Sequence, residues 1–108
     1  MAEKRNINRY RKRLQLRFGE NGPAHMAFTE DISESGLFIR TSRVYPPNTN
    51  LEIELLSMKD DELVNMKGVV MWAKAVPSAL LRTAKKSGMG VKITNITSGE
   101  ECYNKLLD

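Results

Sequence analysis

The chain has 108 residues, 41% of them hydrophobic, which is enough for one small core in a single domain. It contains no run of 18 apolar residues, which excludes a membrane-spanning helix, and its basic start lacks the apolar segment of a secretory signal. Cys102 is the only cysteine, so an internal disulfide is excluded and a reducing cytoplasm is expected. With His25 as the only histidine, no zinc site can form from cysteine and histidine alone.

The positive charge is concentrated at the start of the chain. The formal net charge is +4 and the isoelectric point is about 9.4. Residues 1–17 contain seven Lys/Arg and one acid, so residues 18–108 carry two more acids than bases. Such a segment indicates an anionic partner, either nucleic acid, a nucleotide or a membrane surface, unless it is a solvated tail. We expect residues 1–13 to form a flexible basic arm.

The first half of the chain after the arm predicts three strands. Apolar and polar residues alternate from Leu14 to Phe18, which predicts a half-buried strand that ends at the turn "ENGP". Residues 25–29 and 37–42 are rich in residues that favour extended backbone. The segment "DISESG" between them, residues 31–36, is typical of a turn, so the two strands should form a hairpin.

Three more strands are predicted in the second half. Residues 51–55 have the most regular alternation in the chain, between the loop "YPPNTN" and the turn "MKDDE". Residues 64–76 predict a long strand with a bulge at Gly68. Residues 88–95 predict a last strand with three apolar side chains on one face, which are Met89, Val91 and Ile93.

Two short helices complete the prediction. Pro77 is suited to the first turn of a helix over residues 77–87 that Gly88 would end. Ser98 and Glu101 form a capping-box pattern, which predicts that a C-terminal helix begins there. The apolar side chains of this last helix would pack on the sheet, and they are Tyr103, Leu106 and Leu107.

About six short strands and a terminal helix in so few residues indicate the all-β class. We expect a small closed antiparallel barrel with a C-terminal helix over residues 14–108, preceded by the basic arm at 1–13.

Three motifs in this order resemble the PilZ domain family, the bacterial receptors for cyclic di-GMP. An RxxxR pattern lies in the arm, a DxSxxG sequence follows at Asp31, Ser33 and Gly36, and the strands "GVVMW" and "GMGVKI" come after it. The resemblance covers nearly the whole chain and implies a six-stranded antiparallel barrel with a C-terminal helix. It also implies that the arginines and the DxSxxG residues contact cyclic di-GMP and that the protein acts on an unidentified effector protein. That protein could belong to the control of motility, exopolysaccharide production or pili.

The choice of arginine pair depends on distance from the first strand. Arginine recurs every four residues at Arg5, Arg9, Arg13 and Arg17. In the family the second arginine of the motif lies several residues before the first strand, which favours Arg5 and Arg9 with Arg13 as the reserve. Arg17 alternates with buried positions and is expected to face solvent.

The chemistry of the ligand explains these residue types. Guanine presents O6 and N7 as paired acceptors, which match an arginine fork, and the phosphodiesters carry negative charge. Asp31 would accept the guanine N1–H and amine, and Ser33 would donate its hydroxyl to base or phosphate. Gly36 would allow a positive φ and a close approach of the backbone to the ligand. Trp72 resembles an aromatic residue near the bound guanine in some family members, and the alternative is a tryptophan of the core or barrel rim.

Other classes of function fit the sequence less well. A small basic barrel that binds nucleic acid would display aromatic residues across a sheet face, and this chain has few. A PilZ fold could also serve as a protein-interaction module without ligand, although the motifs argue against that. We expect no enzyme, cofactor or metal, because the sequence has no catalytic set, phosphate loop or clustered acids.

Overall fold

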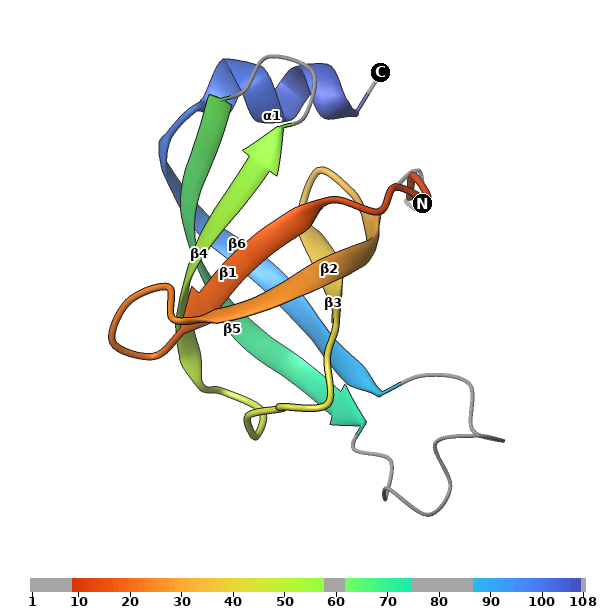
Figure 1. The fold of residues 1–108 in the computed structure, drawn as a ribbon, viewed down its shortest axis with the longest axis vertical. Coiled ribbons are helices and arrows are strands. Elements are labelled where there is room, and N and C mark those ends of the chain that lie inside the picture. Colours follow the sequence, from red (N-terminus) through yellow and green to blue (C-terminus); the bar gives the residue numbers. More distant parts are fainter. Residues whose placement is uncertain (1–8, 58–61, 75–86, 108) are drawn as a thin grey trace, which may run out of the picture.

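The structure is a computed structural model that describes residues 9–57, 62–74 and 87–107 (Figure 1). This part of the chain contains six strands and one helix: β1 (Gln15–Gly19), β2 (His25–Ile32), β3 (Gly36–Arg40), β4 (Asn50–Ser57), β5 (Glu62–Lys74), β6 (Gly88–Ser98) and α1 (Glu100–Leu106). The helix predicted from Pro77 lies outside the described residues, except for Ser87 at its end. No helix in the described part is both long and apolar enough to cross a membrane.

The six strands form a closed barrel in the order β1-β2-β3-β6-β5-β4, with β1 pairing β4 to complete the circle. Each neighbouring pair is antiparallel. The predicted fold class, a small six-stranded antiparallel barrel with a C-terminal helix, is therefore confirmed. Closure also removes sheet edges, which would otherwise expose unpaired backbone groups.

The barrel interior is filled by the alternating apolar residues of its strands. Leu16 and Phe18 of β1 are buried, as are Leu51, Ile53 and Leu55 of β4 and Met89 and Val91 of β6. The helix α1 lies across one end of the barrel, at the top of Figure 1. Tyr103 and Leu106 of α1 are buried in the same core and Leu107 packs against it, as the apolar pattern of the C-terminal segment predicted. Cys102 is buried with them.

The hairpin between β2 and β3 differs from its prediction at one place. β2 continues to Ile32, so Asp31 lies on a strand and the turn is shorter than "DISESG". The register passes from Thr29 opposite Ile39 to Asp31 opposite Phe38, which leaves Glu30 as an extra residue on β2. Such a bulge bends the strand and redirects the side chains beside it.

The bulge predicted at Gly68 lies on the neighbouring strand instead. Lys67 pairs with Asn95 and Gly68 with Ile93, so the extra residue between them is Thr94 of β6. A Cβ atom at residue 68 would lie 2.6 Å from Val91 Cγ1, so glycine at this position allows β5 and β6 to pack closely.

The capping box predicted at Ser98 is wrong. Ser98 belongs to β6, and its Oγ accepts a hydrogen bond from Asn65 Nδ2 at 2.8 Å. The N-cap of α1 is Gly99, with φ at 83° and no side-chain cap. Gly99 is the one residue between β6 and α1. Its backbone is in the left-handed region, which glycine adopts readily.

Candidate functional site

Residues 9–14 run along the outside of β2. Tyr10 N donates to Ile32 O at 2.8 Å, and Ile32 N donates to Tyr10 O at 2.9 Å. Further along, Thr29 Oγ1 donates to Lys12 O at 2.6 Å and accepts from Leu14 N at 2.9 Å. In this structure residues 10–14 are thus hydrogen-bonded to β2. The flexible arm over residues 1–13 stays a prediction, and residues 1–8 lie outside the described part.

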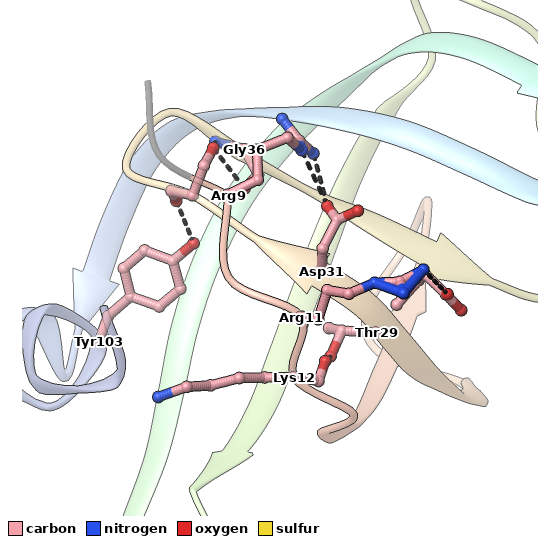
Figure 2. Close-up of polar contacts among 9 residues, drawn as sticks. Arg9, Arg11, Lys12, Thr29, Asp31, Gly36 and Tyr103 are labelled. Carbon is pink, nitrogen blue, oxygen red and sulfur yellow. Dashed lines mark hydrogen bonds and ion pairs between the residues drawn. The ribbon is translucent and has the colours of Figure 1, made fainter. Parts of the chain in front are cut away.

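Arg9 and Asp31 form an ion pair at the end of this segment (Figure 2). Arg9 Nη2 and Nε lie 2.7 and 3.0 Å from Asp31 Oδ1, so both donors share one carboxylate oxygen. The Arg9 side chain is 48% exposed and that of Asp31 is 23% exposed. The pair links the two sequence motifs, and its charges remain within reach of solvent.

Arg9 also lines a small pocket with Gly36 and Trp72. Its volume is about 250 Å³, and the other lining residues are Ser35, Leu37, Met71, Gly90, Val91 and Lys92. Three of the predicted site residues thus meet at one pocket, formed between β3, β5 and β6. Lys92 was not anticipated, because only the register of β3 and β6 places it opposite Gly36.

Trp72 is held flat against the barrel wall. It is 50% exposed, and its ring stacks on Phe38 with centroids 5.2 Å apart and planes at 20°. Gly90 makes room beneath it, since a Cβ there would lie 2.1 Å from Trp72 Nε1. The residue is therefore an exposed aromatic surface and not part of the core.

Ser33 supports the turn from inside. It is fully buried, and its hydroxyl lies 3.1 Å from Gly36 O as donor and 3.2 Å from Gly36 N as acceptor. In this structure the hydroxyl expected to reach the ligand is engaged within the chain.

Gly36 does not adopt the positive φ that glycine allows. Among the described glycines, positive φ occurs at Gly22 and Gly99. A Cβ on residue 36 would lie 2.4 Å from Val91 O, so glycine is required by the approach of β6. The physical reason for this glycine is the packing of two strands, and not the conformation of the turn.

Tyr103 of α1 fixes the same turn from the other side. Its hydroxyl donates to Ser33 O at 2.6 Å, and Figure 2 shows the ring reaching from the helix toward the turn. Burial raises the pKa of Tyr103 to about 12, against the opposing effect of the positive charge on Arg9. The sequence predicted a packing role only, because a bond to a backbone carbonyl 70 residues away leaves no local pattern. Lys12 Nζ adds a second link by donating to Leu106 O at the end of α1.

Replacing Tyr103 by phenylalanine is expected to lower the free energy of unfolding by about 1–3 kcal/mol, because it leaves the buried Ser33 carbonyl without this donor. Thermal and denaturant unfolding would measure the loss. The wild type should also lose stability as pH rises from about 10 to about 12, since tyrosine in the unfolded chain ionises at the lower pH and Tyr103 in the folded protein at the higher. The variant should lack that component, and equal pH profiles for the two proteins would contradict the assignment.

The remaining arginines of the predicted motif are placed differently. The guanidinium carbon of Arg13 lies 4.4 Å from the centroid of the Phe28 ring, away from the pocket lined by Arg9. Arg17 is exposed on β1, as expected. Arg5 lies outside the described residues. Of the predicted pair, Arg9 alone can be placed at the site from the described chain.

The described residues do not form a metal site. They contain no group of three or more His, Cys, Asp or Glu side chains close enough to hold an ion. Cys102 is a free thiol buried in the core.

Comparisons with known proteins agree with this fold. The model of the PilZ domain family matches residues 3–107. A solved structure of the Bacillus subtilis inhibitor of motility, MotI/DgrA, superposes with a TM-score of 0.69 at 14% sequence identity. The match covers 98% of this chain and 53% of that one, so this chain spans about half the length of that protein. A search of curated proteins gave no significant match.

Proposed function

This chain belongs to the PilZ domain family, and from that premise we propose that it is a cytoplasmic receptor for cyclic di-GMP that signals to a partner protein. The observation that supports the proposal most is the position of Arg9. One guanidinium is paired with Asp31 and lines the pocket that contains Trp72. PilZ domains are binding and adaptor modules, so no catalysis is proposed.

We propose that the pocket takes one guanine base of the ligand. At about 250 Å³ it is smaller than the roughly 300–1,000 Å³ of pockets that enclose a drug-sized ligand, so it would hold part of the dinucleotide. The base would stack on Trp72, and Arg9 would donate to guanine O6 and N7. The Asp31 carboxylate would accept the guanine N1–H and amine.

The phosphates would be met by basic side chains beside the base. Lys92 lines the pocket on the β6 side, and Arg5 is proposed to supply the second arginine of the motif. Because Arg9 already donates to Asp31, the ligand would share or replace that ion pair. Such an exchange costs little when both side chains remain partly solvated.

Signal output would follow from the contacts around the site. Three residues after Arg9, the Lys12 ammonium donates a hydrogen bond to Leu106 O at the end of α1. A shift of Arg9 would therefore move the segment that links the ligand pocket to the helix. The structurally similar MotI/DgrA is an inhibitor of motility, so control of motility is one candidate process for this chain, alongside exopolysaccharide and pilus control.

Titration calorimetry with three nucleotides tests the proposed ligand. Cyclic di-GMP is expected to bind more tightly than cyclic di-AMP or GMP, because adenine replaces the O6 acceptor with an N6 donor that an arginine fork cannot use. The same titrations give the number of ligands bound. Equal affinity for cyclic di-AMP, or tighter binding of a mixed oligonucleotide, would contradict the proposal. No binding of any nucleotide to the folded protein would favour an interaction module without ligand.

A further inference from the structure

A second and larger cleft lies beside residues 11–13. Its volume is about 600 Å³, and it is formed by this segment with the outer faces of β2 and β3. The described residues that line it include three arginines, one lysine, one aromatic ring and one carboxylate: Arg11, Arg13, Arg40, Lys12, Phe28 and Glu30. The Lys12 ammonium is bonded to Leu106 O at the end of α1, so the arginines supply the positive charge of the cleft. Among the residues that the structure describes, it shares none with the lining of the pocket of Arg9 and Trp72, so we treat the two as separate sites.

The charges in this cleft are unbalanced. Glu30 Oε2 lies 3.5 Å from Arg11 Nη2, and Glu30 Oε1 lies 3.6 Å from Arg40 Nη1. Both distances are long for a charge-assisted hydrogen bond, and among the described lining residues one carboxylate stands beside three arginines. The Arg11 and Arg40 side chains are 75% and 52% exposed, so their guanidinium groups reach solvent on either side of Glu30.

This arrangement already shows how the cleft holds a carboxylate. The β2 bulge places Glu30 between an arginine of the N-terminal segment and an arginine of β3. Each guanidinium carries five donors in a planar fork, so each can bind a further carboxylate beside Glu30. The chemistry that fits the cleft is a row of carboxylates.

Nucleic acid and membrane surfaces fit less well. The Arg13 guanidinium lies over the Phe28 ring, 4.4 Å from its centroid. A nucleic-acid base therefore cannot stack on that face of the ring. Outside residues 1–17 the chain carries two more acids than bases, so a wide polyanion would meet net negative charge beyond the cleft. A short segment confined to the cleft avoids that repulsion.

We propose that this cleft docks an acidic segment of a partner protein, whose carboxylates bind Arg11 and Arg40 while Arg13 supplies further positive charge. The site uses residues that the nucleotide pocket does not, so docking stands whether or not cyclic di-GMP binds. The partner is defined by its chemistry, a run of Glu or Asp side chains in an accessible segment.

The probe is a fluorescein-labelled peptide of six glutamates, with a six-glutamine peptide as its neutral counterpart. Fluorescence anisotropy at low salt should show binding of the glutamate peptide and none of the glutamine peptide. The double variant Arg11→Gln/Arg40→Gln should bind it at least about tenfold more weakly, as expected from losing two charge-assisted contacts. Arg17→Gln, an exposed arginine on β1 outside the cleft, is the matched control for loss of charge and should change the affinity far less.

Amide chemical shifts of the wild-type protein locate the bound peptide without any substitution. Adding the glutamate peptide should shift the signals of Arg11, Phe28 and Arg40 and leave those around Gly90 in place. The proposal is overturned if the peptide does not bind, if Arg17→Gln weakens binding as much as the double variant, or if oligothymidylate binds more tightly through the same residues. Calorimetry with cyclic di-GMP on the same samples shows separately whether the nucleotide site functions.

Discussion

Replacing Arg9 by alanine is expected to weaken cyclic di-GMP binding by about five- to 150-fold. A bidentate contact between arginine and guanine is worth about 1–3 kcal/mol, which corresponds to that range of dissociation constants. Arg9 pairs with Asp31 and lines the pocket of Trp72. Its loss would remove the guanidinium donors proposed to bind guanine and also the ion pair with Asp31. Calorimetry on the variant and the wild type measures the difference.

Arg17→Ala is the matched control for this experiment. Arg17 is exposed on β1 and lines neither cleft, so its removal costs only long-range attraction that salt screens. Arg13→Ala should have a smaller effect than Arg9→Ala, because Arg13 lies over Phe28. If Arg13 proves essential while Arg5 is dispensable, the RxxxR pair is Arg9 and Arg13, one repeat later than predicted.

Replacing Gly36 by alanine is expected to destabilise the whole barrel. The added Cβ would lie 2.4 Å from the carbonyl oxygen of Val91, and a backbone atom cannot move aside without separating β3 from β6. Overpacking of this kind costs about 1–3 kcal/mol. Each kcal/mol lowers the unfolding midpoint by roughly 4–8 °C in a domain of up to 100 residues, so the expected loss is roughly 4–24 °C.

Circular dichroism during thermal unfolding measures this effect, and Ser35→Ala is the control. Ser35 is an exposed neighbour in the same turn, where truncation should change stability by less than about 0.5 kcal/mol. A Gly36→Ala protein that unfolds at the wild-type temperature would show that β3 and β6 are not in close contact here. The glycine of the motif would then need a ligand-based explanation.

The strands were predictable because a half-buried strand leaves its period in the sequence. The alternation at residues 51–55 predicted β4, where Leu51, Ile53 and Leu55 are buried and Glu52 is exposed. The family motifs added the closed barrel, which local periodicity alone leaves undetermined. The family itself was correctly identified from the order of those motifs.

The details that were missed depend on contacts between distant parts of the chain. The role of Gly36 is decided by Val91 on β6, and the N-cap of α1 by the sharp exit from β6 at Gly99. The bond from Tyr103 to Ser33 O ends on a backbone atom, which no side-chain pattern encodes. Likewise, Lys92 enters the pocket through strand register, which cannot be read from residue spacing.

The most direct test of the receptor proposal uses Trp72, the only tryptophan in the chain, as its reporter. It lines the same pocket as Arg9 and is half exposed, so a base stacked on it would change its fluorescence. Titration with cyclic di-GMP should change the emission in a saturable way in the wild type, with a transition shifted to higher concentration in Arg9→Ala. Emission that stays constant while calorimetry detects binding would place the ligand elsewhere. Constant emission with no heat of binding would contradict the receptor function itself.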